Sequence, residues 1–298
     1  MRVLVTGSSG HVGGAIASRL ISSGWDVIGL SRTPSYIQNL NQNLQIDLGS
    51  KTLAEQISVQ TLRCDAIVHA AADLDKQLYT SDICLTNCLG TQQILKLADF
   101  WQVENFLYIS SVPIIGKPQV LPVTEDHPID PPTAYHASKL FGEYLTLLAN
   151  RNGLTGSILR LTSPIGPGMP DNRILSVFIK RALANQPLQL SGQGTRQQNY
   201  VDVRDVSIAV ENCLRKHAVG LFNIAGKRSI SNLELAQVCI TELASSSKIE
   251  FTGQLDPEEA INWDISIQKA SNYLDYYPRY EIEHSIRALR TKYETSFN

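Results

Sequence analysis

The sequence predicts an α/β fold in which a doubly wound parallel sheet is joined to a smaller C-terminal α/β lobe. Short apolar runs alternate with helix-length amphipathic stretches through the first 165 residues, which is the pattern of successive βαβ units. Three glycines, Gly7, Gly10 and Gly13, lie between the first apolar run and the first amphipathic stretch. After the proline- and glycine-rich segment 164–170 the alternation changes, which indicates a second structural unit.

Each element of the first unit follows from its own pattern. The apolar runs Val3–Thr6 and Asp26–Ser31 predict strands on either side of a helix at His11–Ser23. Parallel strands need such crossovers, and their right-handedness gives a doubly wound sheet. The remaining strands of this unit are expected at 65–70, 105–110 and 155–161, and its remaining helices at 87–101 and 135–150.

The segment from Pro164 to Pro170 cannot continue a helix or a central strand, so we expect it to be a boundary loop. We therefore interpret residues 1–165 as the first domain and residues 166–298 as the smaller lobe, with 190–228 returning in part to the first domain. The elements expected beyond the boundary are helices at 174–185, 206–215 and 232–244 and a strand at 220–225.

Bulk composition excludes several classes of function. The chain has 298 residues, 43% of them hydrophobic, and a formal net charge of −2. It therefore has no basic surface for nucleic acid or an anionic membrane. Its apolar N-terminal strand has no leader-like segment before it, and no long apolar run follows, so we expect a cytoplasmic protein. The five cysteines lack the spacing of a zinc or disulfide framework, so we expect reduced thiols and no metal site.

The glycine segment predicts a dinucleotide-binding turn. Gly7 permits a tight turn, Gly10 lets the backbone approach a pyrophosphate, and Gly13 allows the helix to pack closely on the strand. The helix that follows offers free N–H groups and the positive end of its dipole to phosphate. The residues of this turn that we expect to contact the cofactor are Gly7, Ser9, Gly10, His11, Val12 and Gly13.

The end of the second strand indicates which dinucleotide binds. NAD sites place a carboxylate there, but Ser31-Arg32 offers none, and an arginine suits the 2′-phosphate of NADP. We therefore predict NADP, with NAD bound without its usual carboxylate as the alternative. Asp47, beside Leu48, is either a contact to the adenine or a turn residue. The small residues after the strand at 65–70 suit a close approach to the cofactor, and we expect contacts from His69, Ala70 and Ala71.

Three residues form a candidate catalytic set. Tyr135 and Lys139 lie four residues apart on one face of a predicted helix. An ammonium group beside a phenol stabilises the phenolate, so we expect Lys139 to lower the pKa of Tyr135 toward the working pH. Ser111 follows a strand and can hydrogen-bond the oxygen on which charge develops. Together these residues predict acid–base chemistry at a carbonyl or carbinol carbon.

In this combination the chain resembles the extended short-chain dehydrogenases/reductases of the NAD-dependent epimerase/dehydratase family. The resemblance is carried by landmarks that occur in the family's order: residues 6–13, 69–72, Asn87, Ser110-Ser111, Tyr135 with Lys139, and 192–206. It implies a Rossmann-type domain, a Ser-Tyr-Lys mechanism, nucleotide-sugar substrates and a homodimer formed through a four-helix bundle. It also implies that Lys139 binds the nicotinamide ribose. Further cofactor contacts are expected from Asn87, Thr162 and Pro164.

Departures from the family pattern narrow the expected chemistry. Dehydrating, decarboxylating and doubly epimerising relatives carry acidic residues or a cysteine just after the catalytic serine, where this chain has Val112-Pro113. The remaining reactions are hydride transfer by a keto-reductase, a 4-epimerase or a dehydrogenase. Because a reductase must exchange its cofactor and NADPH is the usual donor, the predicted NADP preference favours a keto-reductase.

Substrate contacts are expected from Val112, Arg173, Arg196 and Asn199. Related enzymes place an arginine on the diphosphate near Arg196 and a second one near 255–263, but this acidic stretch contains none. The alternative substrate is therefore a ketone, an alcohol or a sugar acid without a nucleotide. A non-catalytic NADP-binding sensor is the third hypothesis, and the presence of Ser111, Tyr135 and Lys139 argues against it.

Overall fold

The structure, a computed structural model, describes residues 1–74 and 81–294. A seven-stranded sheet forms the larger part of the molecule, with strand order β10-β6-β5-β4-β1-β2-β3, and every pair of neighbouring strands in it is parallel. The prediction of a doubly wound parallel sheet is confirmed. The elements up to β4 are β1 Arg2–Thr6, α1 His11–Ser22, β2 Asp26–Ser31, β3 Gln42–Gln45, α2 Leu53–Gln60 and β4 Ala66–His69.

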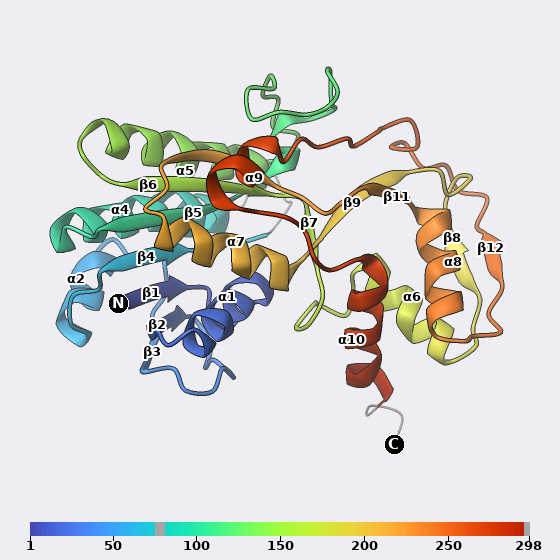
Figure 1. Cartoon of the computed structure of the whole chain (residues 1–298), viewed down its shortest axis with the longest axis horizontal. Coiled ribbons are helices and arrows are strands. Elements are labelled where there is room, and N and C mark those ends of the chain that lie inside the picture. The colour runs from blue at the N-terminus through green and yellow to red at the C-terminus, as the bar shows by residue number, and fades with distance from the viewer. Residues whose placement is uncertain (75–80, 295–298) are drawn as a thin grey trace.

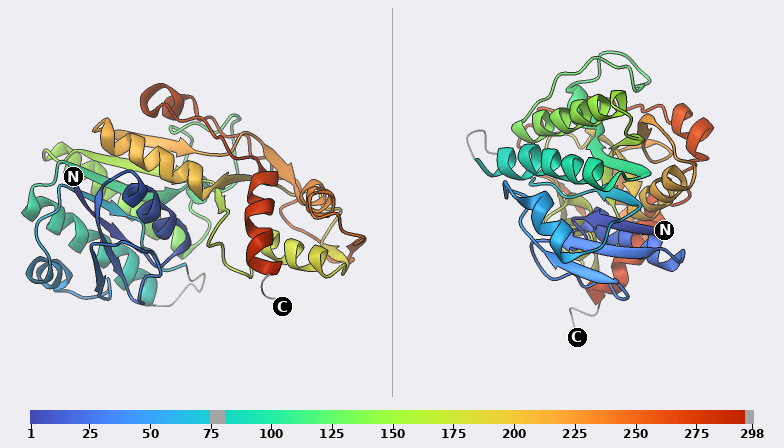
Figure 2. Two further views of the ribbon diagram at one scale, coloured as in Figure 1. Left: turned by 60° about the horizontal axis from the view of Figure 1, so that its bottom comes forward. Right: turned by 90° about the vertical axis from the view of Figure 1, so that its left-hand side faces the viewer.

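Helices cover both faces of this sheet (Figure 1 and Figure 2, right). Helices α2, α4 and α5 pack side by side on one face, and α1, α7 and α9 pack on the other. A one-turn helix and a π-helix precede α4, and a short 3₁₀ helix follows β5. The elements of this stretch are α3 Ser81–Ile83, the π-helix η1 Cys84–Leu89, α4 Gly90–Trp101, β5 Asn105–Ser111, the 3₁₀ helix η2 Val112–Ile115, α5 Ala134–Arg151 and β6 Gly156–Leu161.

The C-terminal part forms a smaller lobe with its own hydrophobic core between α6, α8 and α10 (Figure 1). Two short sheets, β11-β9-β7 and β12-β8, lie in this region. The elements of the chain after β6, some of which return to the main sheet, are β7 Ser163–Ile165, α6 Ile174–Leu183, β8 Leu188–Leu190, β9 Gln197–Asp202, α7 Val203–Arg215, β10 Gly220–Ile224, β11 Ser229–Ser231, α8 Asn232–Glu242, β12 Ile249–Phe251, α9 Gln268–Leu274 and α10 Ile282–Glu294.

The boundary segment differs from the prediction at its start. Pro164 lies inside β7, which pairs in parallel with β9, whereas the sequence analysis places it in a loop. The strand lies at the edge of its three-stranded sheet, where proline is tolerated because only one side of the strand needs a ladder of hydrogen bonds. From Gly166 onward the chain turns, with positive φ at Gly166 and Gly168.

The chain crosses between the two parts of the molecule more than once. After β9 in the smaller lobe, α7 packs along α1 on the main sheet, and β10 pairs with β6 as the last strand of that sheet. The chain then returns to the lobe as β11 and α8 (Figure 1). Segments far apart in the sequence therefore meet at the carboxyl ends of the central strands.

Candidate active site

The amino end of α1 is open to a negatively charged ligand. Its N-cap is Gly10, its first turn carries no acidic residue, and no side chain within the described residues caps it. Three N–H groups at a helix start have no helical partner and, with the helix dipole, attract phosphate. Gly7 has φ +74°, and a Cβ at this position would lie 2.9 Å from the Ala71 Cα. A Cβ on Gly13 would lie 2.3 Å from the Gly7 carbonyl oxygen, so the turn requires glycine at both positions.

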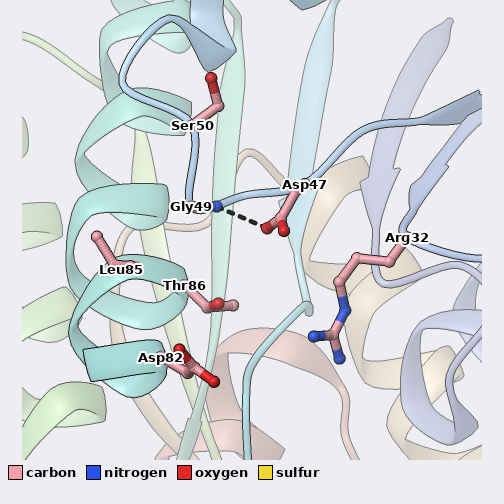
Figure 3. Close-up of a pocket in the computed structure, with 7 residues that line it drawn as sticks. All are labelled: Arg32, Asp47, Gly49, Ser50, Asp82, Leu85 and Thr86. Atoms are coloured by element: carbon pink, nitrogen blue, oxygen red, sulfur yellow. Dashed lines mark hydrogen bonds between the residues drawn. The ribbon is translucent and has the colours of Figure 1, made fainter. Parts of the chain in front are cut away.

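A cavity of about 390 Å³ lies beyond the ends of β2 and β3 (Figure 3). Arg32 points into it from the strand side, and Thr86 and Asp82 face it from the helical side. Asp47 also lines the cavity, and its Oδ1 accepts a hydrogen bond of 2.9 Å from the Gly49 N–H. Asp47 is therefore both a turn residue and a cavity residue. The Leu48 side chain is buried in the core, so only its main chain is free for a ligand.

Ser31 and Ser9 shape the wall of this region. The Ser31 hydroxyl donates to the Thr33 carbonyl at 2.6 Å, and the Thr33 hydroxyl donates to the Ser9 Oγ at 3.1 Å. These bonds fix the loop after β2 against the glycine turn. Val12 and Ala70 are half-buried beside the core on the α1 side of the sheet.

A buried chain of hydrogen bonds links the glycine turn to the helix α4, and its direction can be assigned. The Thr6 Oγ1 accepts from the Ala71 N–H at 3.1 Å, and the Thr91 Oγ1 donates to the Asn87 carbonyl at 2.6 Å. Thr6 therefore donates to His69 Nδ1 at 2.8 Å, and His69 Nε2–H donates to Thr91 at 2.9 Å. The imidazole is neutral in this arrangement, and burial lowers the pKa of His69 to about 3.

Asn87 connects the cofactor region to the helix that carries Tyr135. Its side chain accepts from the Asp73 N–H, donates to the Asp73 carbonyl, and donates to the Ser138 hydroxyl at 2.9 Å. Ser138 in turn donates to the Tyr135 carbonyl at 2.7 Å. The side chains of His69 and Asn87, which were expected to touch the cofactor, are thus hydrogen-bonded within the protein.

Helix α5 runs antiparallel to β6 and delivers Tyr135 to the carboxyl ends of the central strands. Near the end of α5, Asn150 donates to the Gly156 carbonyl at the start of β6. Seven residues earlier in α5, Glu143 pairs with Arg160 near the end of β6. The next turns toward the start of α5 carry Lys139 and Tyr135. They therefore lie toward the carboxyl ends of β5 and β6, the end at which Ser111 is the last residue of β5.

The protonation states of the two helical residues differ from the sequence-based expectation. Burial raises the pKa of Tyr135 to about 12, and the charge that opposes this shift is that of Arg173. Burial lowers the pKa of Lys139 to about 7, and its Nζ lies 4.6 Å from the centre of the Tyr108 ring. The expected lowering of the Tyr135 pKa by Lys139 is therefore wrong for the protein alone, because burial dominates and Arg173, rather than Lys139, supplies the opposing charge.

Two further residues at the strand ends were expected to contact the cofactor. Thr162 directly follows β6; its hydroxyl is buried and has no hydrogen-bond partner among the described residues. A buried, unpaired hydroxyl can complete its hydrogen bonding with a ligand. Pro164 follows in β7 and is half-buried.

The expected substrate contacts separate into two groups. Val112 is buried with Ile114, Ile115 and Val123 in a small apolar cluster, and both ends of the Asn199 amide are bonded to the Gly226 backbone. Neither side chain faces a ligand in this arrangement. The partner of Asn199 lies far away in the sequence, which is why the local pattern did not predict it.

Arg196 is already paired. Its guanidinium forms ion pairs with Asp256, at 3.8 Å, and with Glu258. Next to it, Glu259 accepts hydrogen bonds from the Gln193 N–H, at 2.5 Å, and from the Thr195 hydroxyl, at 3.3 Å. The acidic stretch therefore neutralises the arginine that was expected to hold a diphosphate.

Arg173 has the opposite environment. It is exposed at the N-cap of α6, and no carboxylate among the described residues lies within ion-pair distance of it. Its charge lowers the pKa values of both Tyr135 and His11. Arg173 is thus close enough to both residues for its charge to act on them. Of the expected substrate contacts, it alone carries a charge without an ion pair among the described residues.

The comparisons with known proteins identify the family. Residues 3–225 match the NAD dependent epimerase/dehydratase family. The chain belongs to this family. A putative UDP-glucose 4-epimerase of Methanocaldococcus jannaschii is 32% identical to it over 222 residues, which cover 70% of this chain and 71% of the relative. A dTDP-glucose 4,6-dehydratase of Streptomyces niveus is 27% identical to this chain over 255 residues. These cover 80% of this chain and 76% of the relative.

Solved structures of epimerase/dehydratase family proteins share the fold. A UDP-glucose 4-epimerase from Thermotoga maritima, bound to UDP-glucose, superimposes with a TM-score of 0.90 at 22% identity over the whole of both chains. A UDP-glucose 4-epimerase of Thermus thermophilus in complex with NAD gives a TM-score of 0.86 at 22% identity, over 99% of each chain. This family member is thus an NAD(P)-dependent enzyme of the short-chain dehydrogenase/reductase type.

The residues present fit such a cofactor. The uncapped start of α1, the glycine contacts and the free Thr162 hydroxyl supply phosphate and ribose partners. The part of the chain that the structure describes contains no cluster of three or more metal-binding side chains. No helix within residues 1–74 and 81–294 has the length and apolar character that a bilayer crossing requires.

Sequence reasoning missed several residues that support the site. Thr91 and Ser138 carry the hydrogen bonds that link the cofactor turn to α5, and Tyr108 forms the surface under Lys139. Tyr108 had one signal: it lies three residues before Ser111, and the strand residues next to it, Leu107 and Ile109, are apolar. The two hydroxyl residues lie inside predicted helices, where nothing local distinguishes them from solvated positions.

Proposed function

We propose that this protein is an NADP-dependent enzyme that transfers hydride at one carbon of a nucleotide sugar, as a keto-reductase or a 4-epimerase. The observation that carries this proposal is the delivery of Tyr135 and Lys139 by α5 to the end of β5, where Ser111 lies. The relatives support the substrate class, because they include a putative UDP-glucose 4-epimerase and a dTDP-glucose 4,6-dehydratase.

The roles of the three residues follow from their chemistry. When bound, the nicotinamide supplies or accepts the hydride. Ser111 donates a hydrogen bond to the substrate oxygen, and Tyr135 passes a proton to or from that oxygen. With a pKa of about 12, Tyr135 is a protonated phenol at neutral pH, which suits proton donation to a carbonyl oxygen in the reductive direction. Lys139 lies one helical turn behind it, where it can hydrogen-bond a ribose hydroxyl.

The residues after Ser111 support simple hydride transfer. Val112 and Pro113 begin η2, and Val112 is buried in the apolar cluster described above. Neither can move a second proton, which dehydration or decarboxylation at this position needs. We therefore propose a reaction that changes the oxidation state or configuration at one carbon.

The cavity of Figure 3 supports the cofactor preference. Arg32 projects its guanidinium into the space beside Asp47 and Thr86, where a ribose 2′-phosphate could accept bonds from its fork of N–H groups. Several similar solved structures hold NAD. NADP in this chain is thus a proposal that depends on Arg32, and an experiment given in the Discussion tests it.

A second candidate substrate is a small ketone, alcohol or sugar acid without a nucleotide. It is favoured by the ion pairs of Arg196 with Asp256 and Glu258, which leave this arginine neutralised. Arg173 could then bind a carboxylate or a single phosphate beside Tyr135. In either case we propose that the elements after residue 165, apart from those on the main sheet, form the substrate-binding lobe.

The proposed assembly is a homodimer in the cytoplasm. Exposed apolar side chains on α4 and α5 support the dimer, as argued in the Discussion. The five cysteines are all free thiols, which fits a reducing compartment.

Turnover and nucleotide binding test the function together. The protein is incubated with NADPH or NADP⁺ and a panel of UDP-, dTDP-, GDP- and CDP-sugars, and product is measured by chromatography. Tyr135→Phe should lower turnover by about 10²- to 10⁴-fold, while its thermal shift with NADPH stays that of the wild type. Tyr277→Phe is the matched control, because Tyr277 is exposed and lies outside α4 and α5.

The same panel separates the two substrate classes. A nucleotide that binds the folded state raises its melting temperature by mass action. A shift with one of UDP, dTDP, GDP or CDP supports the nucleotide-sugar proposal. No shift with any of them at millimolar concentration would contradict it and favour the smaller substrate. Full activity of Tyr135→Phe would contradict the catalytic assignment.

A further inference from the structure

A buried ion pair lies directly behind Lys139. Glu143, one helical turn further along α5, is 2% exposed, and its partner Arg160 on β6 is 3% exposed. The Arg160 Nε donates to Glu143 Oε1 at 2.9 Å, and its Nη2 donates to Oε2 at 2.8 Å. The Ser110 hydroxyl, from β5, donates to Oε1 at 2.5 Å. Three hydrogen bonds from two strands therefore fix the carboxylate against the inner face of α5.

Stability alone does not explain this pair. Removing two charges from water costs several kcal/mol per ion, and apolar residues of similar size often serve as well. A carboxylate at this position does have one specific effect: it is four residues from Lys139 on the same helix face, so the two side chains are neighbours. The charge of Glu143 raises the pKa of Lys139 and so opposes the larger effect of burial.

The other groups around Lys139 do not supply a balancing negative charge at neutral pH. Tyr135 on α5 and Tyr108 on β5 are protonated phenols, since burial raises both of their pKa values. His69 on β4 is neutral. Arg160 on β6 is positive and lies on the far side of the carboxylate. Among the described residues that face Lys139, Glu143 is thus the single anion.

We propose that Glu143 is a positioning residue for Lys139, and that its carboxylate, clamped by Ser110 and Arg160, increases the fraction of Lys139 that is charged near neutral pH and directs its amine along α5 toward Tyr135. The proposal rests on the proposed function, in which Lys139 acts beside Tyr135. In this proposal Ser110 and Arg160 act indirectly: they hold the Glu143 carboxylate, and the carboxylate influences the charge of Lys139. Arg160 also donates to the Glu125 carbonyl at 3.1 Å, which ties this ion pair to the segment between η2 and α5.

Two variants with opposite expected effects test the proposal. Glu143→Gln keeps the shape of the side chain and removes its charge, so the pKa of Lys139 should fall by about one pH unit or more. Arg160→Gln removes the positive charge behind the carboxylate, so the pKa of Lys139 should rise. A purely structural role for the pair would not move the two values in opposite directions.

The measurement needs neither a substrate nor turnover. Protein labelled with ¹³Cε-lysine is titrated by NMR, and the Lys139 signal is identified by its absence in Lys139→Arg. In the wild-type protein this signal should titrate near pH 7, in line with the lowered pKa. An unchanged Lys139 titration in folded Glu143→Gln would overturn the proposal. If Glu143→Gln does not fold, Arg160→Gln carries the test alone, and a Lys139 pKa that does not rise in it overturns the proposal.

A kinetic readout distinguishes this proposal from the proposed function. With an active substrate, kcat falls as rising pH removes the proton of Lys139. In Glu143→Gln this fall should occur at lower pH than in the wild type, while KM changes little. Glu143→Asp, which keeps the charge, should restore much of the wild-type profile. A shifted titration in a protein that turns over no substrate supports the role of Glu143 and contradicts the proposed function instead.

Discussion

At the scale of single residues, the hydrogen bonds around His69 determine how the protein responds to acid. Because burial lowers its pKa to about 3, the folded state takes up no proton there over a range in which the unfolded chain, with a pKa near 6.5, does. The difference in bound protons makes stability fall as the pH drops below about 6.5 and on toward 3, with no effect above that range.

We predict that His69→Gln flattens this loss. Glutamine can accept from Thr6 and donate to Thr91 but cannot be protonated. The slope of unfolding free energy against pH between pH 6 and 4 should therefore fall by up to about 1.4 kcal/mol per pH unit. Urea denaturation at several pH values measures the slope. His284→Gln, at an exposed position, serves as control; equal slopes for wild type and His69→Gln would refute the assignment.

Arg32 carries the prediction on cofactor choice. If its guanidinium binds the 2′-phosphate, Arg32→Ala should weaken NADPH binding by about 1.5–3 kcal/mol, the range for a charge-assisted hydrogen bond, and leave NADH binding nearly unchanged. Fluorescence titration of both cofactors measures the ratio. Arg63→Ala is the control, because Arg63 bonds the Gln102 carbonyl in an exposed region away from the cavity. An unaltered NADPH-to-NADH ratio would mean that NAD is the natural cofactor.

Site residues could be predicted from the sequence when their role depends on residues close to them in the chain. The glycines of the turn and the pair Tyr135 and Lys139 are of this kind, since a turn or a helix sets their spacing. Arg196 is the opposite case: its pattern suggested a ligand contact, but two carboxylates sixty residues further on pair with it. No local pattern reports a partner at that separation.

At the scale of elements, the packing of α5 on β5 depends on Gly142. A Cβ at this position would lie 2.3 Å from the Cζ and from the hydroxyl oxygen of Tyr108. The helix can approach the strand closely only because this side chain is absent, and that approach brings Lys139 over the Tyr108 ring.

We predict that Gly142→Ala destabilises the protein by about 1–3 kcal/mol, the usual cost of overpacking. Alanine favours a helix over glycine by about 1 kcal/mol, so a loss can come only from the clash. Chemical denaturation measures it. In a Tyr108→Leu background, which removes the ring, the same substitution should be neutral or stabilising. A loss of equal size in both backgrounds would show that the contact with Tyr108 is not its cause.

Elements with long, regular patterns were predicted closely, and short polar ones were not. The strand at Asp26–Ser31 has the predicted bounds, because a buried central strand shows a continuous apolar run. β3, with the sequence QNLQ, is an edge strand that buries one face with a single leucine, so its pattern resembles a loop. The helix expected from residue 87 begins as a π-helix at Cys84 and becomes α-helical at Gly90; hydrophobic spacing does not distinguish these two windings.

At the scale of the whole molecule, α4 and α5 present apolar side chains to solvent. Phe141, Tyr144 and Leu148 on α5 are 43%, 57% and 48% exposed, and Phe100 on α4 is 72% exposed. The three residues of α5 follow a helical spacing that places them on one side, and α4 and α5 are neighbours on the sheet. A second copy of the chain that packs the same two helices against these would bury them in a four-helix arrangement.

We predict a dimer that Leu148→Glu dissociates, because a carboxylate would be buried without a partner at the interface. Sedimentation equilibrium measures the mass of both proteins. Val59→Glu, on the exposed face of α2, should leave the dimer intact. A monomeric wild-type protein at high micromolar concentration would exclude this interface.

The position of β10 has a consequence for how the protein can be divided. Residues 220–224 complete a sheet whose other six strands all come from the first 161 residues. A fragment that stopped at residue 165 would leave β6 as an uncovered border, with its apolar residues and unpaired backbone groups free to join other chains. It would also lose α7, which covers α1. The part of the chain that forms the main sheet therefore cannot be separated from the rest at one point in the sequence. The segment that leads from β6 through the smaller lobe to β10 has to be kept with it.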